Sequence, residues 1–303
     1  MIPVADSGCH RPHAAMNTRT PAMQTCRYYV CGFSLALLIF ATAGCENRRM
    51  ENLLQKANEE WVGGRNHSAI EIFKSVLEKS PSGPYTEEAL FRLGEIHHFG
   101  LGETTRAVTY FQEVAQMTPQ GPFAYPAQKY IAEIVEITFQ DLEQAIIEYQ
   151  KLINEFSHAG EQAEHQYRIA SIYFKKHDYE QAMVELEILL EEYSESTWAE
   201  EALFRMTEIL YTLRRCDESR ETYSKFRVRY PGSAYTGEIE YIMASCLEDE
   251  GKLKLARARY KSLEGTYKYP ALLKMKLEGI ASRINKGGKS KRKIRRSLRM
   301  RKG

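Results

Sequence analysis

The sequence predicts an all-α protein, a solenoid of about six helix-turn-helix repeats followed by a closing helix. The main observation is a pair of small residues, called here the first and second marker, that recurs every 37 or 38 residues. In addition, an aromatic or leucine residue stands four positions, about one helical turn, after each second marker. Self-similarity at such a period is typical of repeat architectures. The marker pairs are Ala57/Ala69, Gly94/Ala107, Ala132/Ala145, Ala170/Ala182, Thr207/Ser219 and Ala244/Ala256.

Each repeat is expected to form two amphipathic helices, because apolar residues recur at intervals of three and four in both halves. Asp141 and Asp178 each stand three residues before a glutamine, where a carboxylate can cap the amides that begin a helix. Between repeats, turn sequences such as Pro81-Ser-Gly-Pro84 end one helix and start the next. The repeats are predicted over residues 51–270, and residues 271–285 are predicted to form a helix that caps the last repeat.

These markers resemble the tetratricopeptide repeat, in which paired small residues let helices approach closely and the aromatic residue fills the gap. The resemblance covers about residues 50–270 and implies a right-handed solenoid whose first helices line a concave face that binds proteins. The long period and the loop Tyr230-Pro-Gly-Ser-Ala-Tyr235 are similar to the outer-membrane protein assembly lipoprotein (BamD) family. The tetratricopeptide protein of the Tol-Pal system shares the Tyr-Pro-x-Ser loop. The regular sixth repeat and the basic tail depart from the assembly lipoprotein.

Residues 1–44 are predicted to be a secretory signal peptide. Arg27 is followed by an apolar run from Phe33 to Phe40 and then by the small residues Ala41-Thr-Ala-Gly44. Export signals share this order of positive, apolar and small residues. A start at Met16 or Met23 would give a signal of more ordinary length.

Cys45 follows the small residues directly, which resembles the lipobox of bacterial lipoproteins and implies lipid attachment, with residues 45–50 as a lipidated linker. Two alternatives remain open. Ala41-Thr-Ala43 also fits ordinary signal peptidase, which would release a soluble periplasmic protein, and an uncleaved apolar segment would barely span a bilayer. By resemblance to lipoprotein sorting, Glu46 after the cysteine implies the outer membrane.

The repeats carry no catalytic or cofactor-binding motif, so neither an enzyme nor a cofactor is expected. The composition, 43% hydrophobic and 27% charged residues, excludes a disordered or collagen-like chain. His97 and His98 are adjacent and point about 100° apart on a helix, which favours packing over metal binding. Cys216 and Cys246 are the cysteines of the repeats. Cys246 is interpreted as a buried packing thiol, or the two could pair across adjacent repeats in an oxidising compartment.

The first helices carry the candidate partner-binding residues, at positions that are constant relative to the first marker. Aromatic residues three before and four after the marker, with glutamates six before and one after it, are expected to share one face. Rigid aromatics supply contact area and carboxylates select basic partners. The alternative is solvated helix surface with half-buried aromatics. The candidates are Trp61, Phe91, Glu95, His98, Glu133, Tyr167, Phe174, Glu201, Phe204, Glu208, Tyr211 and Tyr241.

Residues 286–303 hold ten Lys and Arg residues and no acidic residue, after the flexible pair Gly287-Gly288. A block of like charge is expected to be disordered when free. Its expected partners are anionic lipid or the acidic groove of the same chain, and solvated disorder without a ligand is the alternative. Nucleic acid is not expected, because the signal peptide directs export.

The leading hypothesis is a lipid-anchored periplasmic scaffold that binds protein partners at the outer membrane, in outer-membrane protein assembly or insertion. The alternative is a periplasmic adaptor in envelope maintenance or cell division, of the Tol-Pal kind. A third hypothesis is a cytosolic repeat protein associated with nucleic acid, whose apparent signal is false.

Overall fold

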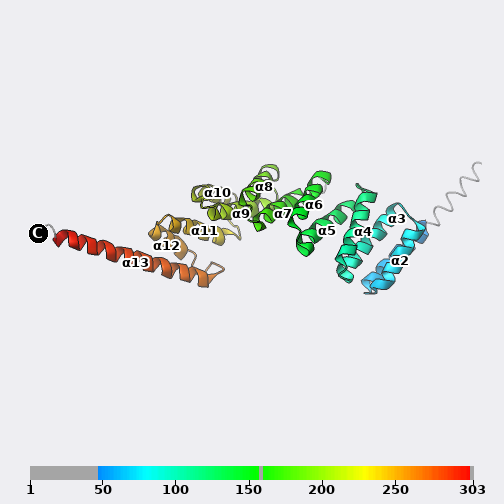
Figure 1. The fold of residues 1–303 in the computed structure, drawn as a ribbon, viewed down its shortest axis with the longest axis horizontal. Coiled ribbons are helices and arrows are strands. Elements are labelled where there is room, and N and C mark those ends of the chain that lie inside the picture. The colour runs from blue at the N-terminus through cyan, green and yellow to red at the C-terminus, as the bar shows by residue number, and fades with distance from the viewer. Residues whose placement is uncertain (1–46, 157–159, 301–303) are drawn as a thin grey trace, which may run out of the picture. The chain divides into compact units, whose positions relative to one another are not determined.

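The computed structural model describes residues 47–156 and 160–300, with side chains described to residue 286. All regular elements in these ranges are helices, which confirms the predicted fold class (Figure 1). The signal peptide and Cys45 lie outside the described residues. No helix within the described ranges is long and apolar enough to cross a membrane.

The helices follow one another in short antiparallel pairs joined by tight turns. The first helix covers residues 47–62. It is followed by α2 (Asn66–Lys79), α3 (Pro84–Glu95), α4 (Thr104–Met117), α5 (Ala124–Glu133), α6 (Leu142–Glu155), α7 (Gln162–Lys175), α8 (Tyr179–Glu192), α9 (Trp198–Thr212), α10 (Cys216–Arg229), α11 (Thr236–Asp249), α12 (Leu253–Lys261) and α13 (Pro270–Met300).

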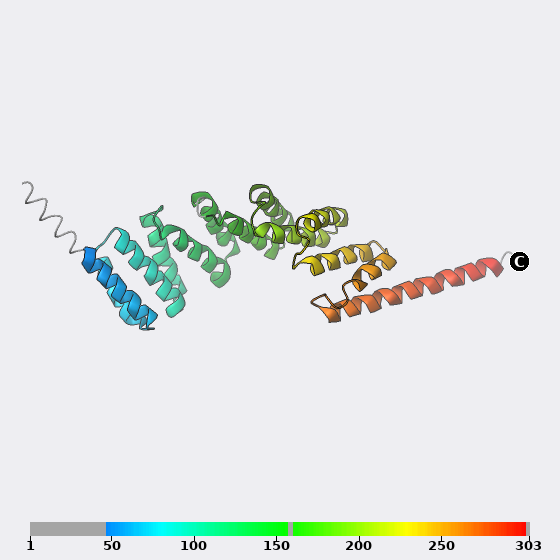
Figure 2. The same cartoon turned by 180° about the vertical axis from the view of Figure 1, so that it is seen from behind.

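The chain divides into two compact units, residues 1–92 and residues 93–303. In the first unit the core includes Leu54, Ala57, Phe73 and Val76. In the second unit each helix from α4 to α13 packs against the next one along the chain, as Figure 2 shows from behind. The first helices α7, α9 and α11 also contact one another in sequence, so successive repeats stack.

The marker residues are buried in all six repeats, which confirms the phase of the predicted repeat. The residues one turn after the second markers are buried as well: Phe73, Phe111, Tyr149, Leu186, Tyr223 and Tyr260. Gly94 shows why the marker is small. A Cβ atom placed there would lie 2.5 Å from Cε1 of Phe111.

The second and third repeats each hold one residue more between their markers than the other four, and the structure accommodates it in π-helical turns. These turns, η1 (Ile96–Gly100) and η2 (Ile134–Phe139), end the first helices of those two repeats. The amide of Leu101 donates to the carbonyl of Ile96 over 3.1 Å, a bond that spans five residues. After the first helix, every repeat has one residue with left-handed backbone: Gly64, Gly102, Gln140, His177, Arg214 and Gly251.

The predicted capping boxes begin α6 and α8. Oδ1 of Asp141 accepts a hydrogen bond from the amide of Gln144 over 3.1 Å, and Oδ1 of Asp178 accepts from the amide of Gln181 over 3.3 Å. Of the two prolines in the first inter-repeat turn, Pro81 lies between α2 and α3, and Pro84 is the first residue of α3. The starts of α6 and α8 therefore follow local sequence chemistry.

The carboxyl end differs from the expected disordered tail. α13 runs from Pro270 to Met300 without interruption, and its first half buries Leu273 and Ile280 in a core with Tyr260 and Leu263. A helix that packing has already nucleated extends at low cost, and Lys and Arg are good helix formers. These two effects outweigh the cost of about 1 kcal/mol for each glycine in the pair at 287–288. Beyond the packed segment, α13 extends past α12 (Figure 1).

Candidate partner-binding site

The twelve candidate residues on the first helices are all half-buried or buried. Phe91, Glu95 and Tyr167 are buried, and the other nine are half-buried. The side chains at these constant spacings therefore lie at the edge of the core. Their partners determine what each can still bind.

Arg205 contacts candidate residues of both the fourth and the fifth repeat. Its guanidinium donates to Oε2 of Glu208 over 2.6 Å and lies 3.8 Å from Oε1 of Glu201. The same group lies over the ring of Phe174, with Cζ 4.9 Å from the centroid. The hydroxyl of Tyr167 donates to Oε1 of Glu201 over 2.7 Å. The two carboxylates are thus compensated within the protein, and the ring of Phe174 stacks on the cation.

Aromatic pairs link neighbouring repeats along this face. The rings of Tyr167 and Trp198 stack with centroids 4.9 Å apart, and those of Phe204 and Tyr235 stack at 4.7 Å. Burial raises the pKa of Tyr167. In each pair one ring comes from a first helix and the other from the start of the next first helix. Much of the predicted aromatic surface therefore joins repeats to each other.

The third repeat has a second compensated cluster. Lys129 donates a hydrogen bond to Glu161 and lies 3.8 Å from Oε2 of Glu164. Burial raises the pKa of Glu133, and the nearby Lys129 and Arg168 oppose this effect. The Lys129 bond lowers the pKa of Glu161. In this part of the predicted groove, Glu161 and Glu164 are thus paired with Lys129.

An open acidic pocket lies within residues 47–92. It has a volume of about 720 Å³ and lies between the first helix and the beginning of α3. Glu51, Glu59 and Glu88 line it with no lysine or arginine, and Leu54 and Val62 supply apolar surface. Its remaining lining residues are Gln55, Asn58, Gly63 and Tyr85.

Tyr85 of α3 contacts the first helix at this pocket. The sequence spacing did not identify this residue. Its hydroxyl donates to Oε1 of Glu51 over 3.3 Å, and burial raises its pKa. The recurring glutamate six residues before the first marker, which gives Glu51 and Glu88, was the signal that pointed to this place. Trp61 lies beside the guanidinium of Arg92, at 5.9 Å from ring centroid to Cζ, and does not line the pocket.

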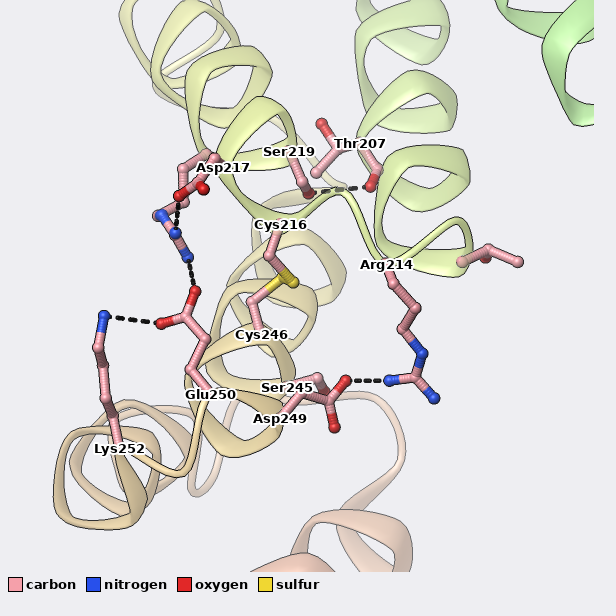
Figure 3. Close-up of a disulfide and its surroundings, with 12 residues drawn as sticks. Thr207, Arg214, Cys216, Asp217, Ser219, Ser245, Cys246, Asp249, Glu250 and Lys252 are labelled. Carbon is pink, nitrogen blue, oxygen red and sulfur yellow. Dashed lines mark hydrogen bonds and ion pairs between the residues drawn. A yellow bond between two sulfur atoms is a disulfide. The ribbon is translucent and has the colours of Figure 1, made fainter.

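Cys216 and Cys246 form a disulfide between α10 and α11, with Cα atoms 5.7 Å apart (Figure 3). Of the two interpretations, pairing across adjacent repeats is the one realised. Arg214 pairs with Asp249 beside it, and Arg220 pairs with Glu250 over 2.6 Å. The fifth and sixth repeats are thus joined by one covalent and two ionic contacts (Figure 3).

The two adjacent histidines have separate environments. Nδ1 of His97 lies 2.8 Å from Oε2 of Glu103, and its ring stacks on Tyr110. His98 is half-buried, and burial lowers its pKa. They do not converge on a common point, as their helical spacing predicts.

Comparison with known proteins identifies the repeat. A sequence profile described as tetratricopeptide repeat matches residues 54–122, and a second one so described matches residues 166–196 and 201–233. No curated protein matches the sequence.

Solved structures with the same fold are distant in sequence. A tetratricopeptide repeat protein from Parabacteroides merdae is 19% identical, with a TM-score of 0.48 over 76% of this chain and 85% of that one. The apo form of RapI is 15% identical, with a TM-score of 0.51 over 78% and 75%. A structure of Naa15/Naa10 bound to HypK-THB is 12% identical, with a TM-score of 0.53 over 77% and 34%. The protein is therefore an all-α helical solenoid, and three of its segments match the tetratricopeptide repeat.

Proposed function

We propose that this protein is a lipid-anchored scaffold at the periplasmic face of the outer membrane, where it binds basic segments of partner proteins. The observation that carries the binding role is the acidic pocket of residues 47–92. Glu51, Glu59 and Glu88 line it, and none of its described lining residues is a lysine or an arginine. A basic segment with an apolar side chain would match both the carboxylates and the surface of Leu54 and Val62.

The export signal and the disulfide support the periplasmic part of the proposal. Disulfides persist in oxidising compartments and are rare in the cytosol. Cys216 and Cys246 already lie at bonding distance in the fold. The order of residues before Cys45 supports lipid attachment there.

Work in outer-membrane protein assembly is the more specific part of the proposal, and its support is the similarity of the inter-repeat loops to the assembly lipoprotein family. Pull-down of the tagged protein from detergent-solubilised membranes tests it. Recovery of a β-barrel insertase supports the assembly role. Recovery of peptidoglycan-linked partners instead would replace it with the Tol-Pal type of adaptor.

The pocket is tested with a labelled peptide that carries lysines on both sides of a leucine. Glu88→Gln should weaken its binding by about tenfold at low salt, because one of the three carboxylates that line the pocket is lost. Glu208→Gln is the matched control, since Glu208 pairs with Arg205. Equal affinity of all three proteins would remove the pocket from the proposal.

The anchor is tested by Cys45→Ser and metabolic labelling with a palmitate analogue. The wild type should carry the label and the variant should not, because serine lacks the thiol that the lipid modification requires. Equal labelling of both proteins would rule out Cys45 as the lipid attachment site.

A further inference from the structure

In three repeats, a polar pair closes the contact between the two helices of the repeat. Its members stand four residues before the first marker and three after the second marker. Nε2 of Gln128 donates to Oε2 of Glu148 over 2.6 Å, and Nε2 of Gln166 donates to Oε2 of Glu185 over 2.6 Å. In the sixth repeat Nε of Arg259 donates to Oε2 of Glu240 over 2.6 Å.

The fifth repeat lacks this polar pair and has a cavity instead. Leu203 and Thr222 occupy the two positions, and both line a cavity of about 480 Å³ between α8, α9 and α10. Leu190 and Met206 complete an apolar floor. This volume lies within the range of pockets that hold ligands or anchoring side chains, about 300 to 1,000 Å³.

The rim of the cavity carries opposite charges on its two sides. Glu187 and Glu191 project from α8, and Lys225 and Arg229 project from α10. Arg229 also binds Glu195 over 2.8 Å. Among the described residues, Glu191 and Lys225 form no ion pair, and both side chains are exposed. The rim therefore has charge available on both sides.

We propose that this cavity is a second docking site, which takes an apolar side chain of a partner protein flanked by one basic and one acidic residue. The apolar floor takes the anchor, the glutamates of α8 take the basic residue and the cations of α10 take the acidic one. None of the residues that line this cavity lies within residues 47–92. The site is thus separate from the one in residues 47–92 and prefers a different peptide.

The test uses the purified full-length chain in detergent and a fluorescent peptide with the pattern Lys-x-x-Leu-x-x-Glu, where x is serine or glycine. The filling variant is L203Q with T222E, which gives the fifth repeat the polar pair of the third and fourth repeats. Binding should weaken by about tenfold or more, because the pair occupies the cavity. Replacing the peptide leucine with serine should have the same effect on the wild type.

If the filling variant melts at a lower temperature than the wild type, a second variant that changes the rim charges still tests the proposal. Lys225→Glu with Arg229→Glu changes only exposed side chains. The affinity for the Lys-Leu-Glu peptide should fall by about tenfold. The affinity for a Lys-Leu-Lys peptide should rise, because both sides of the rim are then acidic. Unchanged affinity in the rim variant overturns the proposal, as does unchanged affinity in a filling variant that melts like the wild type.

Glu88→Gln separates this proposal from the acidic pocket. That variant should bind the Lys-Leu-Glu peptide like the wild type, because Glu88 does not line the cavity. If Glu88→Gln lost as much affinity for the Lys-Leu-Glu peptide as for the all-basic peptide, both peptides would bind in residues 47–92. That result would overturn the second site.

Discussion

Cys216, the first residue of α10, is bonded to Cys246 near the end of α11, so the fifth and sixth repeats are covalently joined. The two cysteines are 30 residues apart in the sequence. In a solenoid, stability comes from each repeat and from its interface with the next one. A bond across one interface therefore stabilises the terminal repeat.

Removal of this bond by Cys216→Ser with Cys246→Ser should lower the free energy of unfolding by about 3 to 4 kcal/mol, as expected for a loop of this length. Urea unfolding followed by circular dichroism measures the difference. The wild type with reductant is the control and should match the variant. An unchanged midpoint in both would show that the bond contributes nothing to stability.

Gly94→Ala should destabilise the protein by about 1 to 3 kcal/mol, because the added Cβ would lie 2.5 Å from the ring of Phe111. Gly279→Ala in α13 is the matched control, since a Cβ there meets nothing within 4 Å. The control should be neutral or stabilising, as alanine is the better helix former. Adding Phe111→Leu to Gly94→Ala should recover part of the loss, and strict additivity would contradict the steric explanation.

Gln140→Gly should stabilise the protein by about 0.5 to 1 kcal/mol, because Gln140 has a left-handed backbone with φ of 56°. Gly102 occupies the same place in the second repeat, with φ of 69°. Gly102→Gln should therefore destabilise by a similar amount. Thermal melts compare both variants with the wild type, and a shift of both in the same direction would contradict this prediction.

His165 should make stability depend on pH between about 4 and 6.5. Burial lowers its pKa to about 4, with Lys129 adding to the effect, and Tyr125 bonds Nε2 over 3.0 Å. In the unfolded chain the imidazole gains a proton below about pH 6.5, whereas in the folded chain it stays neutral down to about pH 4. Stability should fall by about 2 to 3 kcal/mol as pH drops through this window, with no further loss from His165 below it.

Urea unfolding at several pH values measures this dependence, with His165→Gln as the control that cannot titrate. Tyr125, Glu161, Lys129 and Arg168 also face the imidazole and remain in the control. The difference between the two proteins therefore isolates His165. Parallel curves would show that His165 does not titrate in this range.

The candidate site was predicted only in part. Sequence spacing placed Glu201 and Glu208 on one helix face and led to the expectation of an acidic groove. Arg205 lies between them in the same helix, yet its guanidinium reaches both carboxylates and Phe174 of the preceding repeat. The compensation of Glu201 and Glu208 by Arg205 is therefore local to α9, at spacings of four and three residues. The contact with Phe174 of the preceding repeat depends on how the helices pack, which periodicity does not provide.

The repeat could be predicted from the residues alone, because a close helix contact requires a small residue and that requirement recurs locally at a constant period. The starts of α6 and α8 are local in the same way, since capping by Asp141 and Asp178 involves only neighbouring residues. Only the tertiary structure decided that Cys216 meets Cys246, that π-helical turns hold the extra residues, and that Leu203 and Thr222 leave a cavity. Each of these depends on the packing of helices against one another, where distances of a few ångströms decide whether two groups bond or leave space.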